Sequence, residues 1–93
     1  MSAYAIVTIQ LEDPKTFARY REIAGPALGK HKGKPMAVSS ESQVIEGDGA
    51  APDVTVILEF PDRDHALAWI SDKELDEVHA TRRASGRSQI ILM

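Results

Sequence analysis

The stretch over residues 54–70 constrains the fold of this chain more than any other part of the sequence. Val54–Phe60 is a short, largely apolar run rich in β-branched residues, which is typical of a buried strand. Asp62 follows at once and can cap the first turn of a helix, in which Ala66 and Trp69 would share the apolar face. The stretch therefore predicts a buried strand that leads directly into an amphipathic helix, and this helix carries the one tryptophan of the chain.

The first strand is predicted over residues 3–11, which are rich in apolar and β-branched side chains. Val7 and Ile9 lie on one face of this strand, and Tyr4 and Ile6 lie on the other. Strands that are apolar on both faces are usually covered on both faces. We therefore expect cover on each side of the sheet.

Asp13 and Pro14 predict the start of the first helix. The Asp13 side chain can accept hydrogen bonds from free backbone N–H groups, and proline fits the first helical position because its missing N–H would be unpaired there. An apolar stripe at three-to-four spacing follows until Gly25-Pro26, where proline removes a helix hydrogen bond. We expect a main helix over residues 14–24, a short continuation, and a solvated loop over residues 30–34.

Two segments between this helix and the buried strand also favour β-structure. Residues 36–39 and 43–46 indicate either one bent second strand or two short strands. Residues 47–52 combine glycine, aspartate and proline, which is typical of a loop between strands. We therefore expect this loop to connect the second strand to the third.

The last part of the chain predicts another helix and a final strand. Ser71 and Glu74 form a capping-box pattern, with serine at the cap and glutamate three residues later. One face of the helix that they open would be made of Leu75, Val78, His79 and Arg82. Gly86 would end this helix, and residues 88–93 predict the last strand.

The predicted order of elements is β-α-β-β-α-β, with the second helical element split in two. This is the order of the ferredoxin-like α+β fold, an antiparallel sheet with helices on one face. A chain of 93 residues fits one such domain, over residues 1–93. Because helices would cover only one face while the strands are apolar on both, a second copy of the sheet is the simplest cover for the other face. We therefore predict a homodimer.

Composition narrows the class of protein and its partners. The chain has 11 Lys and Arg against 14 Asp and Glu, a net charge of −3, and its basic cluster at residues 30–34 is short and has no interleaved aromatic residue. We therefore expect no nucleic-acid partner. No apolar run approaches the ~18 residues of a membrane span, and the first residues lack the pattern of a signal peptide, so no membrane association is expected. The absence of cysteine suits a reducing compartment, and the expected location is the cytoplasm.

Five short motifs are spread in order along nearly the whole chain. They are Tyr4-x-Ile6-Val7, Asp13-Pro14-x-x-Phe17-x-x-Tyr20, Val44-Ile45-Glu46-Gly47, Glu59-Phe60-Pro61 and Ala66-x-x-Trp69. Together they resemble the domain-of-unknown-function family 1330. The resemblance implies a dimeric α+β barrel, in which two ferredoxin-like sheets face each other, and this agrees with the strands that are apolar on both faces.

The wider group of dimeric α+β barrels includes cofactor-free monooxygenases, haem-degrading enzymes, lactone isomerases and ligand-sensing domains. A shared fold does not choose among these activities. The resemblance therefore implies an uncharacterised activity, and we expect no cofactor.

The chain departs from the usual pattern of this family at four places. Ile70 stands where a tyrosine commonly follows the tryptophan, and Leu75 stands where a tyrosine commonly follows the glutamate. Lys32-Gly33 replaces a Gly-Gly pair, and Ser39-Ser40 replaces an arginine or similar polar residue. If those polar groups bind a ligand in relatives, this chain is expected to bind a different ligand or none.

The three histidines do not form a metal motif. Metal sites need histidines and carboxylates at short spacings that share one face, as at positions i and i+4 of a helix. Glu74 and His79 are five residues apart, and His65 lies fourteen residues before His79, so we expect no metal site. His31 and His65 are expected to be ordinary surface or half-buried residues. His79 is the histidine best placed for function and is a candidate catalytic residue.

Tyr20 and Trp69 are candidate substrate-binding residues. Both are predicted on helix faces that pack against the sheet, which is where small-molecule pockets form in this fold. Either they are core aromatic residues, with the Tyr20 hydroxyl bonded to one partner, or they line a flat apolar pocket for an aromatic or quinone-like ligand.

Glu59 is a candidate catalytic residue, because a carboxylate within an apolar strand is costly to bury unless it is paired. If it faces a pocket, its pKa would rise and it could act as a general base. Alternatively, it forms an ion pair at the strand end with Arg82, Arg83 or Arg87. Arg82 and Arg83 are expected to be solvated rather than anion-binding, although Arg82 is kept as a third candidate substrate-binding residue.

Three functions remain open. The first is a small cofactor-free enzyme, monooxygenase-like or isomerase-like, that acts on a small apolar or aromatic metabolite, with Tyr20 and Trp69 shaping the pocket and Glu59 or His79 moving a proton. The second is a non-catalytic module that binds a small ligand, and the third is a structural homodimer without one. The first is slightly favoured, because related barrels are so often enzymes.

Overall fold

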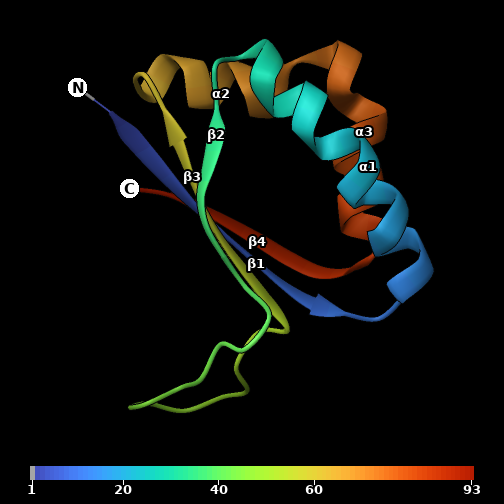
Figure 1. Cartoon of the computed structure of the whole chain (residues 1–93), viewed down its shortest axis with the longest axis vertical. Helices are drawn as coiled ribbons and strands as arrows, with labels where there is room; N and C mark the ends of the chain where they lie inside the picture. Colours follow the sequence, from blue (N-terminus) through green and yellow to red (C-terminus); the bar gives the residue numbers. More distant parts are fainter. Residues whose placement is uncertain (1) are drawn as a thin grey trace.

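The computed structural model describes residues 2–93 and contains a four-stranded antiparallel sheet with helices on one face (Figure 1). The strands are β1 (Ala3–Leu11), β2 (Lys34–Ser39), β3 (Val54–Phe60) and β4 (Gly86–Leu92), in the order β2-β3-β1-β4 across the sheet. Between the strands lie α1 (Pro14–Lys30), α2 (Arg63–Ser71), the 3₁₀ helix η1 (Lys73–Leu75) and α3 (Asp76–Ala84). This arrangement confirms the predicted ferredoxin-like α+β fold. Across residues 2–93, no helix has both the length and the apolar character needed to cross a membrane.

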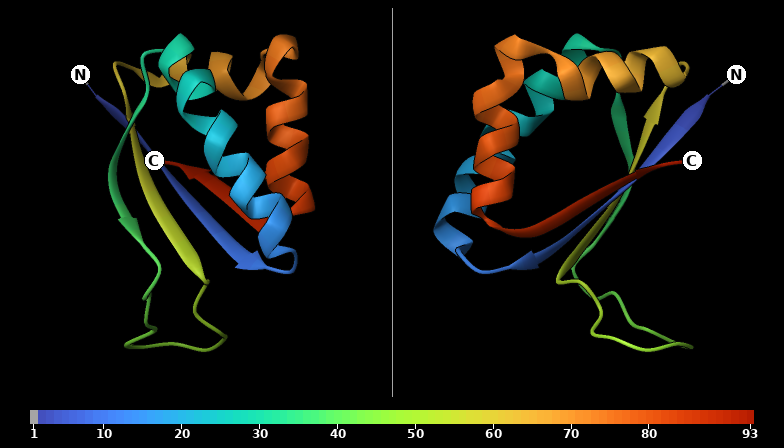
Figure 2. Two further views of the ribbon diagram at one scale, coloured as in Figure 1. Left: turned by 45° about the vertical axis from the view of Figure 1, so that its right-hand side comes forward. Right: turned by 180° about the vertical axis from the view of Figure 1, so that it is seen from behind.

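One face of the sheet packs against the helices and forms the core. In the central strand β1, Ala5, Val7 and Ile9 are buried on this face, and β3 adds Leu58 and Phe60. The helices lie on the same side of the sheet in both views of Figure 2. The core therefore lies between one sheet face and one layer of helices.

The opposite face of the sheet is uncovered in the described chain and carries an apolar row. Ile6 of β1 stands opposite Ile57 of β3 on one side and Ile91 of β4 on the other, and Ala37 of β2 stands opposite Ile57. This open-face row of Ala37, Ile57, Ile6 and Ile91 thus crosses all four strands, and Ile91 is 49% exposed. The prediction that the first strand has apolar side chains on both faces is confirmed.

Helix α1 runs without a break from Pro14 to Lys30, so the predicted interruption at Gly25-Pro26 is wrong. A proline within a helix removes one backbone hydrogen bond and crowds the preceding turn. Here the helix continues because the next two residues, Ala27 and Leu28, are buried against the core. The predicted helix start is confirmed, since Asp13 accepts hydrogen bonds from the backbone N–H and the hydroxyl of Thr16.

The second strand is shorter at one end and longer at the other than predicted. It begins at Lys34, within the predicted solvated loop, and ends at Ser39, while residues 43–46 form no strand. The pairing of β2 with β3 ends at Ser39 and Thr55, so residues beyond this point have no neighbouring strand to bond. Residues 40–53 instead form a long arm between β2 and β3, which projects from the sheet in Figure 1.

The helix and strand boundaries after β3 differ from the prediction by one or two residues. Asp62 caps α2 as predicted, but Asp72 and not Ser71 caps η1, accepting a hydrogen bond from Glu74 N at 2.9 Å. Ser71 instead donates to a carbonyl oxygen of the preceding turn. Strand β4 begins at Gly86, where an added Cβ would lie 2.0 Å from the carbonyl oxygen of Gln10, so only glycine fits this close strand pairing.

Candidate functional site

An apolar cavity of about 300 Å³ lies between α1 and the helix-covered face of the sheet. This volume is at the lower end of the roughly 300–1,000 Å³ of small-molecule pockets. Its walls include core residues of β1 and β3, two residues of β2, and Trp69 of α2. Along α1 the lining residues are Phe17, Tyr20, Arg21, Ala24, Gly25 and Leu28. The cavity is more enclosed and more apolar than the depressions of about 560 and 330 Å³ elsewhere on the surface.

Trp69 and Tyr20 both line this cavity. Trp69 is 3% exposed, and its ring packs 5.6 Å from the Phe60 ring and 4.9 Å, edge to face, from the His79 ring. Tyr20 is half-buried on α1, with its ring 6.3 Å from that of Phe17. The predicted position of these two residues is confirmed, and their role in ligand binding stays a prediction.

His79 lies behind the Trp69 wall and not in the cavity lining. The side chain is 2% exposed, its Nε2 lies 2.9 Å from the carbonyl oxygen of Trp69, and its Nδ1 lies 2.7 Å from Nη1 of Arg82. Because a guanidinium can only donate and a carbonyl can only accept, His79 carries its proton on Nε2 and accepts at Nδ1. Burial lowers the pKa of His79, and the nearby Arg82 charge lowers it further, so the ring is held neutral.

Arg82 is buried, although the sequence led us to expect a solvated side chain. It is 3% exposed, and its guanidinium carbon lies 6.0 Å from the centre of the Tyr20 ring and 5.8 Å from that of Trp69. Within residues 2–93 its Nε and the indole Nε1 of Trp69 are buried without a hydrogen-bond partner, and Arg82 forms no ion pair. Trp69, His79 and Arg82 are called the Arg82 cluster below. Arg83 is exposed, as expected.

The two aromatic faces and the end of α3 stabilise the buried arginine in part. Cations are attracted to the faces of tryptophan and tyrosine within about 6 Å. Arg82 also lies in the last turn of α3, where the carbonyl groups of the helix end favour a positive charge. Neither interaction supplies a counter-charge, so the Arg82 cluster is positive at neutral pH.

Glu59 lies on the open face of the sheet, away from this cavity. Its carboxylate lies 3.5 Å from Nζ of Lys34 and accepts a hydrogen bond of 3.4 Å from the Tyr4 hydroxyl. A hydrogen bond from Ser2 is the main cause that lowers the pKa of Glu59, and Lys34 lowers it further. The predicted pairing with Arg82, Arg83 or Arg87 is therefore wrong, because β2 brings Lys34 to this position instead. A catalytic role for Glu59 stays a prediction, and this geometry favours an ordinary surface carboxylate.

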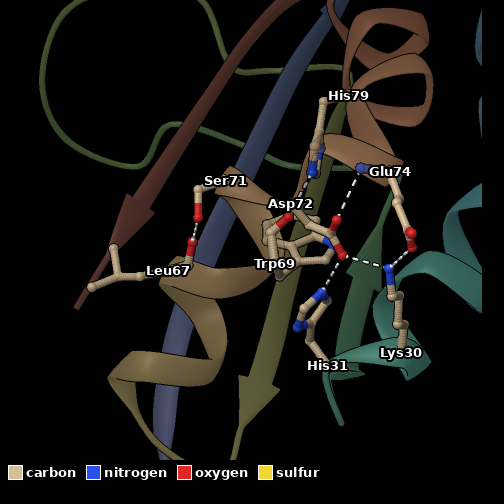
Figure 3. A network of polar contacts seen from close by, with 8 residues as sticks. All are labelled: Lys30, His31, Leu67, Trp69, Ser71, Asp72, Glu74 and His79. Carbon is tan, nitrogen blue, oxygen red and sulfur yellow. Dashed lines mark hydrogen bonds and ion pairs between the residues drawn. The ribbon is translucent and has the colours of Figure 1, made fainter.

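A second polar cluster joins the end of α1 to η1 at the surface (Figure 3). Oδ2 of Asp72 lies 2.7 Å from Nζ of Lys30 and 2.8 Å from Nε2 of His31. Lys30 also forms an ion pair with Glu74. Hydrogen bonds from Lys30 and His31 hold the pKa of Asp72 far below its usual range. These four residues are called the Asp72 cluster. Sequence reasoning missed it, because no local pattern relates residues 30 and 31 to residue 72.

The remaining histidine has a structural role. His65 lies in the first turn of α2, and its Nδ1 is 2.7 Å from Oδ1 of the capping residue Asp62. Hydrogen bonds from His65 lower the pKa of Asp62. Residues 2–93 contain no group of three or more histidine, cysteine or acidic side chains that could hold a metal ion.

The family model for "Domain of unknown function (DUF1330)" matches residues 2–93. The chain belongs to this family. The resemblance carried by the five sequence motifs is thus confirmed, and the activity of the family is not established. A comparison with curated proteins finds no significant match.

Solved structures with the same fold include proteins of unknown function and oxygenases. The RPA0582 protein of unknown function from Rhodopseudomonas palustris has a TM-score of 0.83 at 18% identity, over 99% of this chain and 80% of that one. A dimeric ferredoxin-like protein of unknown function from Jannaschia sp. CCS1 has a TM-score of 0.70 at 14% identity, over 100% and 98%. SnoaB, a cofactor-independent oxygenase from Streptomyces nogalater, has a TM-score of 0.62 at 12% identity, over 99% and 88%. At these identities the likeness establishes the fold alone.

Proposed function

We propose that the cavity between α1 and the sheet binds a small apolar or aromatic metabolite, on which the protein acts as a cofactor-free enzyme. The observation that carries this proposal is a partly enclosed apolar cavity lined by three aromatic rings, with buried unpaired polar groups next to two of them. Pockets of this composition, apolar with few polar groups, are the usual form of small-molecule sites. The same fold in a cofactor-independent oxygenase supports the enzymatic part.

The cavity residues suggest distinct roles within this proposal. Tyr20 and Trp69 shape the site and hold a flat ligand through their ring faces. His79 orients the guanidinium of Arg82, since both of its ring nitrogens are already hydrogen-bonded. This makes His79 a positioning residue rather than the group that takes a proton from the substrate. In an oxygenase without a cofactor, the substrate itself must supply the electrons that reduce oxygen, so an easily deprotonated substrate fits best.

A thermal-shift screen with a cavity-blocking variant tests the binding proposal. Gly25 lines the cavity, and an added Cβ there meets no atom within 4 Å, so Gly25→Phe should fill the cavity while α1 stays intact. Gly29 lies in the same helix with equally open surroundings and outside the cavity, which makes Gly29→Phe the matched control. Metabolites that raise the melting temperature of the wild type and of Gly29→Phe, but not of Gly25→Phe, would support the proposal. Ligands that stabilise all three proteins equally would contradict it.

Turnover separates an enzyme from a non-catalytic binding module. Each stabilising compound should be incubated with protein and oxygen, with oxygen uptake and product mass followed over time. Uptake that disappears in Gly25→Phe would support an oxygenase, and a change of structure without uptake would support an isomerase. Binding without oxygen uptake and without a change in the structure of the ligand would support a non-catalytic ligand-binding module.

We further propose that the protein is a homodimer built on the open face of the sheet. The open-face row of Ala37, Ile57, Ile6 and Ile91 crosses all four strands without cover in the described chain, and structural neighbours from Jannaschia and Thermobifida fusca are dimeric. Ile57→Glu places a charge in the middle of this row and should give a monomer by light scattering after size exclusion. Leu67→Glu changes an exposed residue of α2, on the other side of the sheet, and should remain dimeric. A wild-type monomer would contradict the proposal.

The proposal keeps the expected cytoplasmic location, which fractionation of the source cells would test.

A further inference from the structure

The surroundings of the cavity are positively charged, although the chain as a whole is acidic. Arg21 at α1 is the one charged side chain among the described lining residues, and Arg82 lies behind the rings of Tyr20 and Trp69. No carboxylate lines the cavity, whereas the chain contains 14 acidic residues against 11 basic ones. The charge around the cavity is thus positive, whereas the net charge of the whole chain is negative.

Two buried donors of the Arg82 cluster have no acceptor in the described chain. Nη1 of Arg82 donates a hydrogen bond to Nδ1 of His79. Nε of Arg82 and Nε1 of Trp69 are buried without a hydrogen-bond partner in the described chain. Nearly all buried polar groups in proteins are hydrogen-bonded, so two such donors in one cluster call for an explanation. A buried arginine is ordinarily paired with a carboxylate or another anion.

Resting on the proposed function, we propose that the ligand of this cavity is a small organic anion with an apolar body. Its apolar part occupies the space between α1 and the sheet, and its negative group lies toward Arg82. Trp69 lines the cavity, and its indole N–H is the second donor without a partner in the described chain. The class includes carboxylates of one-ring acids and the anions of acidic enols or phenols, which a cavity of about 300 Å³ can hold.

The position of Arg82 explains how it selects an anion without lining the cavity. Its guanidinium carbon lies 6.0 Å from the centre of the Tyr20 ring and 5.8 Å from that of Trp69, and both of these rings line the cavity. A charge in such an apolar interior acts strongly because water does not screen it. Tyr20, which is half-buried, and Trp69 lie between this charge and the cavity-lining residues of α1 and the sheet only in part, so the charge is expected to act across them. Arg21 lies at the exposed side of the cavity and is expected to attract the anion without fixing it.

Matched pairs of acid and amide test this inference. Benzoate and benzamide have nearly the same shape and differ in charge, and cyclohexanecarboxylate with its amide gives a pair without an aromatic ring. Binding is measured by calorimetry and by the fluorescence of Trp69, the one tryptophan of the chain. In the wild type the acid should bind at least about tenfold more tightly than the amide, because a poorly screened positive charge near the cavity attracts the ionised group and not the neutral one.

Variants identify the group responsible for this preference. In Arg82→Gln the acid-to-amide ratio should fall to about one, while Arg82→Lys, which keeps the charge, should retain part of it. In Arg21→Gln the ratio should stay within about twofold of the wild type, because an exposed charge is screened. Trp69→Phe keeps an aromatic wall and removes the indole donor, so it should lower the ratio without abolishing binding. Calorimetry replaces fluorescence for this variant.

The outcomes separate this inference from the proposed function. If acid and amide bind the wild type equally, and both are excluded by Gly25→Phe, the cavity binds ligands but the anion preference is wrong. If neither compound of either pair binds the wild type, while a neutral ligand from the metabolite screen binds it and is excluded by Gly25→Phe, the anion preference is wrong and the proposed function stands. A ratio that falls in Arg21→Gln but not in Arg82→Gln would place the anion at the exposed side and overturn the role of Arg82. If Arg82→Gln does not fold, the acid-to-amide affinity ratios of the wild type and of Trp69→Phe still test the anion preference.

Discussion

The molecule contains two polar clusters near α2, and they differ in how their charges are balanced. In the Asp72 cluster, the carboxylate of Asp72 meets Lys30 and His31 at the surface, so each charge has a partner (Figure 3). In the Arg82 cluster, one buried guanidinium meets a neutral imidazole and two aromatic rings. The first cluster joins two elements and needs nothing more. The second is buried, positive and incomplete, and an incomplete buried cluster next to a cavity is typical of a ligand site.

The largest expected effect is the loss of stability on removing the acceptor from the Arg82 cluster. His79→Ala leaves Nη1 of Arg82 and the carbonyl oxygen of Trp69 without partners and opens a space beside the indole ring. We expect the free energy of unfolding to fall by roughly 2–4 kcal/mol, measured by urea denaturation. His79→Gln offers one acceptor and one donor and should recover part of this loss. A loss below about 1 kcal/mol in His79→Ala would show that the cluster is not tightly packed.

The two clusters should weaken in different ranges of pH. Since the pKa of His79 is lowered in the folded state, the unfolded chain takes up a proton first, and stability falls as the pH drops below the ordinary value of 6.5. For Asp72 the lowered pKa gives stability that is present above the ordinary value of 3.8 and is lost as the pH falls further. Unfolding by urea at a series of pH values measures both. His79→Gln should remove the change near neutral pH and keep the acidic one, and an unchanged profile would contradict this assignment.

The smallest effect is expected in the Asp72 cluster. Asp72→Asn removes the charge that pairs with Lys30 and His31 and keeps an acceptor for Glu74 N, so the loss of stability should be clearly smaller than in His79→Ala. Added salt should reduce this loss in part, because the Lys30 side chain is 41% exposed and salt screens exposed charges. The loss in His79→Ala should not change with salt. Equal salt dependence in the two variants would contradict the contrast between the clusters.

Much of the fold could be predicted from the sequence, because local patterns determine it. The alternation in β1 and the caps at Asp13 and Asp62 each act within a few residues. The predictions that are wrong concern segments whose structure depends on contacts with residues distant in the sequence. Helix α1 continues past Pro26 because the residues that follow are buried in the core. Residues 43–46 form no strand because the pairing of β2 with β3 ends at Ser39.

The candidate site could be predicted only in part. Tyr20 and Trp69 were found because aromatic residues on apolar helix faces pack against the sheet. The burial of Arg82 could not be inferred, because arginine is usually exposed, although its place on one face with Leu75 and His79 was a usable signal. The apolar neighbours of Glu59 in the sequence predict a buried carboxylate. Because side chains alternate along β3, Glu59 instead lies on the open face of the sheet beside Lys34.

The most direct test of the account follows the indole N–H of Trp69 in the NMR spectrum of nitrogen-labelled protein. The chain has one tryptophan, so this signal is unique and reports a side chain that lines the cavity. We predict that benzoate shifts the signal in a saturable way, that benzamide shifts it far less, and that Gly25→Phe abolishes both shifts. A signal that does not move with either compound, while signals from the protein surface do, would contradict a ligand site at Trp69 and Arg82.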